Sequence, residues 1–251
     1  MVLYEYPFNE NVRTMLRLEQ LFDRLSLLIP RDDAVDHHFA LASMFEVIEV
    51  AARADLKSEM LKDLERHRAQ MNAYRGNPSI SVAALDGVTA QLDHAFNGLN
   101  QMSGKAGHAL SNNDWLMSIR SRINIPAGTC EFDLPGYYAW QQRDPSRRRA
   151  DLMQWLETLA PLAQALRLLL RLLRESGVPR HVVASGGHFQ QSLAQGKSYH
   201  LLRVRLDDAE ELVPEITGHR LMIAVRLMLA DADGRLKPIA RDGSFELTLC
   251  A

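Results

Sequence analysis

The sequence predicts an α+β protein in which an N-terminal, all-helical domain is followed by a small antiparallel β-strand domain. Through most of the first 176 residues, apolar side chains recur at three- and four-residue steps, as on the buried side of a helix. After residue 180 the period changes to two, which is typical of half-buried strands. Residues 2–6 also have strand character, and this N-terminal strand is expected to join the sheet. We therefore expect a helical domain at 9–176 and a β-strand domain formed by 1–8 and 181–251.

The first expected helix, residues 10–29, carries two opposed stripes. At about 100° per residue, Arg13, Arg17 and Arg24 fall within roughly 40° of one another on one side. A guanidinium group can bind a carboxylate through two parallel hydrogen bonds. The row therefore suggests a docking surface for carboxylates, and the ordinary alternative is a solvated helix face. The opposite, apolar stripe consists of Met15, Leu18, Phe22, Leu25 and Ile29.

Further helices are expected after Pro30, which ends the first one. The stretch 97–113 contains Gly98, Gly104, Gly107 and several Ser and Asn residues, and is expected to be a mobile loop. The expected helices run from Asp32 or Asp33 to about Arg53, over 56–74, from Ser79 to about Asn100, around 115–122, from Ser146, and over 159–175.

The strand domain is predicted from three alternating segments, 202–206, 222–229 and 244–250. Residues 231–234, with the sequence DADG, predict a turn after the second segment. Arg226 lies on the polar side of its strand. If that side covers the helical domain, Arg226 lines a cleft between the two domains, where ligands often bind.

Composition excludes several classes of protein. The formal net charge of −2 argues against non-specific nucleic-acid binding. Cys130 and Cys250 are too few and too far apart for a disulfide scaffold or a zinc site. The N-terminus lacks the features of a signal peptide, and the longest apolar stretch, 162–173, is interrupted by Gln164, Arg167 and Arg171. We expect a cytoplasmic protein without membrane insertion.

Candidate sites for catalysis, cofactors or metals lack the pattern that such chemistry needs. Gly98, Gly104 and Lys105 resemble a phosphate loop, but the spacing is wrong and Ala106 replaces the magnesium-binding hydroxyl. We therefore expect no catalytic residues, no cofactor and no metal. The histidines that fit neither a metal motif nor a nucleophile elbow are His37, His38, His181 and His188.

Two more arginine groups stand out. Arg147, Arg148 and Arg149 fall on the first turn of an expected helix, where the helix dipole disfavours cations. This placement hints at an external acidic partner, and a solvated turn is the ordinary alternative. Arg120 and Arg122 are two residues apart on a helix and point in different directions.

Several sequence blocks resemble the ZapD family of Z-ring-associated cell-division proteins, in the same order and over nearly the whole chain. Arg24 lies outside the matching blocks. The blocks are 3–10 (LYEYPFNE), 13–14 (RT), 16–19 (LRLE), 59–66 (EMLKDLER), 120–128 (RSRINIPAG), 132–135 (FDLP) with Trp140, 214–220 (PEITGHR) and 224–226 (AVR).

The resemblance implies a non-enzymatic homodimer at the midcell division site that binds the carboxylate-bearing C-terminal peptide of FtsZ and bundles FtsZ filaments. It also implies a set of peptide-binding residues, of which Arg13, Arg17 and Arg226 match the family motifs most closely. Family members can carry His at the position of Tyr138 and a basic residue near Asp114, so both positions are left out. The implied set is Arg13, Arg17, Arg53, Arg122, His219, Arg220 and Arg226.

Two other classes remain open from the sequence alone. One is an enzyme or binding protein for an acidic small molecule in the cleft between the domains, which would need an acid or base near the arginines. The other is a nucleic-acid-binding protein, which the net charge and the lack of a recognised reading motif disfavour.

Overall fold

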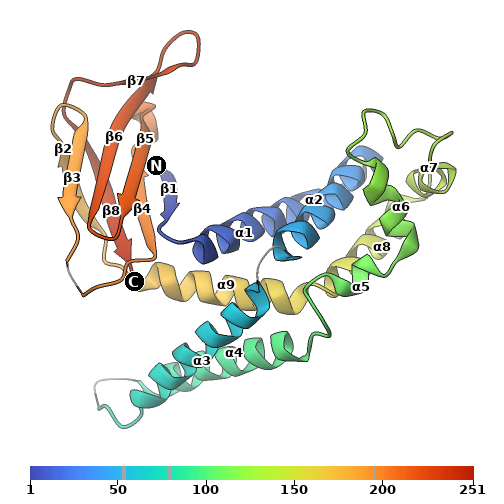
Figure 1. The fold of residues 1–251 in the computed structure, drawn as a ribbon, viewed down its shortest axis with the longest axis horizontal. Coiled ribbons are helices and arrows are strands. Elements are labelled where there is room, and N and C mark those ends of the chain that lie inside the picture. Colours follow the sequence, from blue (N-terminus) through green and yellow to red (C-terminus); the bar gives the residue numbers. More distant parts are fainter. Residues whose placement is uncertain (53–54, 79–80, 195) are drawn as a thin grey trace. The chain divides into compact units, whose positions relative to one another are not determined.

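The computed structural model describes residues 1–52, 55–78, 81–194 and 196–251. These residues form two compact units. The helical unit comprises Thr14–Leu169, and the sheet unit comprises Met1–Arg13 together with Leu170–Ala251. Helices dominate the first part of the chain, the later part holds antiparallel sheets, and the N-terminal strand joins one of them. The α+β class and the pairing of the N-terminal strand are thus confirmed (Figure 1).

The described helices begin and end close to the positions that periodicity predicts. Asp33 caps α2, since its Oδ1 accepts a hydrogen bond from the Val35 amide over 2.7 Å. Ser79 lies outside the described residues, and Ser81 caps α4 instead. The helices are α1 (Glu10–Leu28), α2 (Ala34–Ala52), α3 (Leu56–Ala73), α4 (Val82–Gln101), α5 (His108–Ser111), α6 (Asp114–Arg122), α7 (Pro135–Gln141), α8 (Pro145–Glu157) and α9 (Ala160–Glu175).

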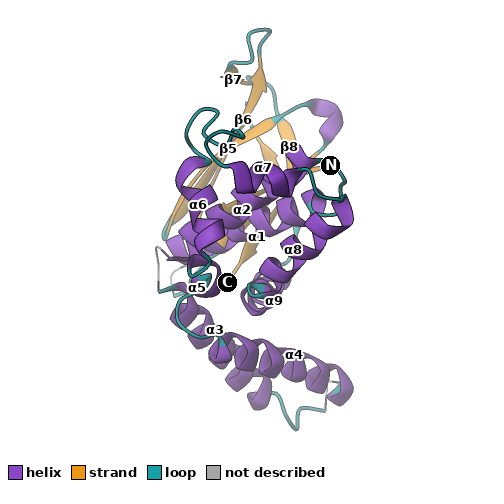
Figure 2. Ribbon diagram, turned by 90° about the vertical axis from the view of Figure 1, so that its right-hand side faces the viewer, coloured by secondary structure: helices purple, strands orange, loops and turns teal. Residues whose placement is uncertain are grey.

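Two features of the helical part differ from the sequence prediction. The stretch 97–113 is not one loop, because α4 extends to Gln101 and α5 begins at His108. The short α7 was not predicted from the sequence, although Pro135 stands at its start, where proline is favoured because that amide needs no acceptor within the helix. In Figure 2, α3 and α4 run side by side as an antiparallel pair.

The core of the helical unit contains the apolar stripe predicted for α1. Met15, Leu18 and Phe22 are at most 4% exposed. Leu41 and Met44 of α2 are equally buried. Burying side chains of this size stabilises the fold by about 1.5–3 kcal/mol each. The packing of one side of α1 therefore leaves the opposite side, with its arginines, available to solvent.

The described residues of the sheet unit form two sheets, whereas a single small sheet was expected. One has the strand order β1-β4-β8-β2; the other has the order β3-β6-β5, with β7 paired to β6. Every strand pair is antiparallel. The strands are β1 (Val2–Pro7), β2 (Arg180–Ala184), β3 (His188–Ser192), β4 (Leu201–Leu206), β5 (Val213–His219), β6 (Met222–Ala230), β7 (Leu236–Pro238) and β8 (Gly243–Cys250), with a 3-10 turn, η1 (Asp208–Glu210), before β5.

Residues from the inner faces of both sheets form one core. Val204 and Leu247, which are paired across β4 and β8, contribute from the first sheet. Val225 and Leu227 of β6 contribute from the second. A single sheet could not bury both sets, so the two sheets pack face to face as a sandwich. This packing places the alternate residues of β6, including Arg226, on the outer face.

An ion-pair network joins β1, β4 and the end of α9 within the sheet unit. The Glu5 carboxylate accepts hydrogen bonds from Arg174 Nε over 2.8 Å and Arg174 Nη2 over 2.6 Å. It also accepts one from Arg203 Nε over 3.0 Å. The Glu5, Arg174 and Arg203 side chains are 15%, 24% and 21% exposed, so water screens this network less than it screens an exposed ion pair.

We expect Glu5→Gln to lower the free energy of unfolding by about 2 kcal/mol, because two shielded guanidinium groups would lose their counter-charge. Urea unfolding followed by circular dichroism measures this loss. The matched control is Glu10→Gln, since Glu10 pairs with Arg13 but its side chain is 74% exposed. An exposed pair contributes less than about 1 kcal/mol. Equal effects of the two substitutions would show that shielding of the Glu5 network is unimportant.

Candidate functional site: exposed arginines and a basic cavity

The arginine row on α1 begins at a capped helix terminus. Asn9 is the cap, because its Oδ1 accepts a hydrogen bond from the Val12 amide over 2.8 Å. Arg17 is exposed, and the Arg13 and Arg24 side chains are 42% and 45% exposed. The predicted separation of an arginine side from an apolar side on this helix is therefore confirmed.

Local carboxylates already hold two arginines of this row. Arg13 Nε lies 3.3 Å from Glu10 Oε2, one helical turn earlier. Arg24 Nη1 donates to Glu46 Oε1 of α2 over 3.1 Å. Arg24 thereby links two helices, which gives it a structural role independent of any ligand. Exposed pairs of this kind contribute little stability, so a ligand carboxylate can replace the partner at small cost.

Arg122 is the last residue of α6. Its Nη1 donates to Asp133 Oδ1 over 2.9 Å, which ties the helix end to the segment before α7. A cation at a helix C-terminus is also favoured by the helix dipole. Arg120 approaches Met117 Sδ at 4.0 Å instead, so the two arginines do point to different surroundings.

Arg226 lies on the outer face of the second sheet, as its alternating pattern predicts. It is paired in register with Glu215 of β5 on one side and with His188 of β3 on the other. Its Nη1 lies 3.3 Å from Glu215 Oε2, and both side chains are more than half exposed. This ion pair is therefore open to competition from an external carboxylate.

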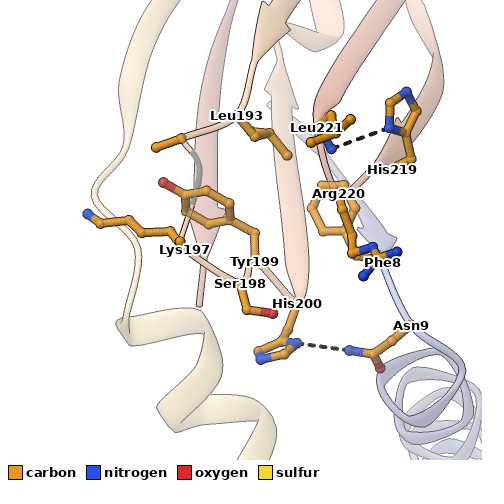
Figure 3. A pocket seen from close by; sticks show the side chains of 12 residues that line it. Phe8, Asn9, Leu193, Lys197, Ser198, Tyr199, His200, His219, Arg220 and Leu221 are labelled. Carbon is orange, nitrogen blue, oxygen red and sulfur yellow. Dashed lines mark hydrogen bonds between the residues drawn. The ribbon is translucent and has the colours of Figure 1, made fainter.

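His219 and Arg220 line a cavity of about 830 Å³ within the sheet unit (Figure 3). His219 ends β5, and its Nδ1 accepts a hydrogen bond from the Leu221 amide over 3.3 Å, which shapes the turn into β6. Phe8 and Asn9, which follow β1, also line the cavity. The structure thus brings these two predicted residues into one cavity, and Arg226 is not among the described residues that line it.

Two basic residues of the cavity were missed by sequence reasoning. Lys197 and His200 come from the segment between β3 and β4, where neither periodicity nor a motif marks them. His200 is held by Asn9, whose Nδ2 lies 2.9 Å from His200 Nδ1. The Asn9 oxygen already accepts from Val12, so the amide nitrogen donates and His200 Nδ1 accepts. Only the fold brings Asn9 and His200 together across the chain.

The remaining predicted site residue, Arg53, lies outside the described residues. Tyr138 is 44% exposed on α7, and Asp114 begins α6. Of the predicted residues that the structure describes, two lie in the helical unit, Arg17 and Arg122, and four lie in the sheet unit, Arg13, His219, Arg220 and Arg226.

The structure corrects the interpretation of the arginine triplet at the start of α8. Arg148 is only 5% exposed, and its Nε donates to His37 Nδ1 over 2.9 Å. Its Nη atoms donate to the backbone carbonyls of Gln141, Arg143 and Asp32. Arg149 pairs with the Asp32 carboxylate. Neither an external partner nor a solvated turn describes Arg148, which joins α8 to α2 and to the end of α7.

Two of the shifted pKa values in the helical unit, those of His38 and Tyr137, belong to an aromatic cluster. His38 Nδ1 lies 2.8 Å from the Tyr137 hydroxyl. Burial lowers the pKa of His38 and raises the pKa of Tyr137 well above its usual range. Tyr137 stacks on Trp140, with ring centroids 5.8 Å apart, and Trp140 Nε1 donates to Asp151 over 2.8 Å. These shifts follow from core packing and do not identify a reacting group.

No described helix combines the length and the apolar character needed to cross a membrane. In the same part of the chain, His, Cys, Asp and Glu side chains form no group of three or more that could hold a metal ion.

Comparison with known proteins shows which family this chain belongs to. A family model described as ZapD, cell division protein, matches residues 16–226. The chain is 50% identical to the cell division protein ZapD of Ralstonia nicotianae over 251 residues, which covers 100% of this chain and 99% of the relative. It is 49% identical to ZapD of Cupriavidus necator over the same length, again covering 100% and 99% of the two chains. The chain that carries these exposed arginines and this basic cavity therefore belongs to the ZapD family of cell division proteins.

Proposed function

We propose that this protein binds the carboxylate-bearing C-terminal peptide of FtsZ and that, as a homodimer, it crosslinks and bundles FtsZ filaments at the division site in the cytoplasm. In this role it stabilises the Z-ring as a protein–protein adaptor, without catalysis and without a cofactor. The observation that carries the proposal is membership of the ZapD family, which the relatives support over the whole length of the chain.

The surface chemistry of the described residues supports a carboxylate ligand. Arg13, Arg122 and Arg226 are 42%, 44% and 54% exposed, and each faces one carboxylate of the chain itself. Such pairs are weak because water screens them. A peptide carboxylate that binds a guanidinium through two bonds at once can therefore displace the resident partner and release it to solvent.

Crosslinking follows from two-fold symmetry. A homodimer presents two identical peptide-binding sites, and each can hold the tail of a different filament. FtsZ tails are repeated along a filament, so each dimer that binds one tail finds others at high local concentration. Modest affinity at a single site is then enough to hold two filaments together.

Sedimentation of FtsZ filaments tests this proposal. At low speed, where single filaments stay in solution, adding the protein is expected to bring most of the FtsZ into the pellet. An excess of free C-terminal peptide is expected to abolish this pelleting, because it occupies both sites of the dimer. A peptide of the same composition in scrambled order is the control. Undiminished bundling in saturating peptide would contradict the proposed mode of binding.

A further inference from the structure

The cavity in the sheet unit combines a rim of basic residues with an apolar wall. Lys197, His200, His219 and Arg220 supply the rim, and neither Asp nor Glu occurs among the described residues that line the cavity. Phe8, Tyr199 and Leu221 contribute to its wall. A volume of about 830 Å³ lies in the range of small-ligand and peptide-side-chain pockets. Its chemistry thus suits a ligand that is both acidic and apolar.

Arg220 differs from three other arginines of the predicted set. Arg13, Arg122 and Arg226 each form an ion pair with a carboxylate of the chain. Within the part of the chain that the structure describes, no carboxylate lies within 4.0 Å of the Arg220 guanidinium or of Lys197 Nζ. A ligand carboxylate at this rim meets cations without first displacing a resident partner.

The apolar wall is exposed at the same place. Leu221 is 62% exposed, next to Arg220 in the turn between β5 and β6. Gly218, just before this turn, leaves room for Phe8, since a Cβ atom there would lie 2.6 Å from Phe8 Cε1. The Phe8 ring can therefore reach the cavity from the segment after β1 (Figure 3). An exposed leucine beside an aromatic ring offers a contact for an aliphatic side chain.

We propose that this cavity binds an aliphatic side chain of an acidic, extended peptide, with the neighbouring peptide carboxylate on Arg220. The proposal rests on the proposed function in that the FtsZ C-terminal peptide is the occupant. It adds that recognition has an apolar component located in the sheet unit, so that peptide charge alone does not determine affinity. Arg220 then binds the carboxylate of the peptide, and Leu221 contacts its aliphatic side chain.

Calorimetric titration with the FtsZ C-terminal peptide tests the cavity. We expect Arg220→Gln and Leu221→Ser each to weaken binding about tenfold, through loss of a charge-assisted bond and of apolar contact respectively. The matched controls in the same unit are Arg235→Gln and Leu229→Ser, both at exposed positions outside the cavity lining. The controls are expected to stay within about twofold of the wild-type affinity.

A second peptide separates the apolar part from the charged part. It keeps every acidic residue of the FtsZ peptide and replaces each aliphatic residue with serine. We expect it to bind the wild-type protein more weakly, and the difference between the wild type and Leu221→Ser to disappear with it. If the FtsZ peptide binds but Arg220→Gln and Leu221→Ser match their controls, the cavity proposal is wrong and the proposed function stands. If the peptide does not bind the wild-type protein at all, both are wrong.

Discussion

Replacing Arg148 with methionine is expected to lower the free energy of unfolding by about 4 kcal/mol and the Tm by about 10 °C. Methionine retains much of the side-chain volume, so the loss comes mainly from hydrogen bonds. The substitution leaves His37 Nδ1 and three backbone carbonyls without the guanidinium that now serves them. His37 is fully buried, so water cannot replace the lost donor there without opening the core.

The adjacent Arg147 provides a matched control for this prediction. It is exposed on the same first turn of α8, and Arg147→Met should change the free energy of unfolding by less than about 0.5 kcal/mol. Both variants remove one positive charge from the same helix turn, so helix-dipole effects cancel in the comparison. Calorimetry of the two variants measures the difference. Equal Tm values would contradict a structural role for Arg148.

Replacing Arg17 with glutamate is expected to weaken binding of the FtsZ peptide about 30-fold or more. The substitution exchanges attraction for repulsion at an exposed position of α1, within the residues that the family model matches. It should leave the fold intact, because the buried stripe of α1 lies on the other side of the helix. Far-ultraviolet circular dichroism checks the fold, and fluorescence anisotropy of labelled peptide measures the affinity.

The matched control for this second prediction is Arg24→Glu. Arg24 lies on the same side of α1, at 45% exposure, and pairs with Glu46. The same change in net charge is made seven residues away, so a general electrostatic effect would appear in both variants. We expect Arg24→Glu to reduce affinity less than about threefold. Equal losses would mean that the peptide responds to overall charge and not to the position of Arg17.

Much of the fold was predictable because periodicity reports burial. The stripe of α1 and the alternation in β4, β6 and β8 each identify one buried side, which is what a half-buried element requires. The second sheet could not be predicted. β3 has the sequence HFQQS and β7 has only three residues, so neither carries a strong alternating signal. Their pairing with β6 comes from tertiary contacts alone.

The candidate site shows the same division between local and long-range information. Arg17 and Arg226 could be placed on the exposed side of their elements because helix and strand geometry determines which side they occupy. Arg148 was misinterpreted since its acceptors, such as the Asp32 carbonyl, lie 116 positions away in the chain. Lys197 and His200 were missed because only folding brings them near Arg220. Local sequence patterns therefore identify which side of a helix or strand is buried, but they do not reveal which distant residues contact it.

The central claim is that this chain binds the C-terminal peptide of FtsZ through arginines, and direct titration of the wild-type protein tests it. We expect binding in the micromolar range at low salt that weakens steadily as salt is raised, since exposed charge pairs are screened over about 10 Å at 0.1 M ionic strength. Absence of binding at low salt, or affinity that does not change with salt, would contradict the account.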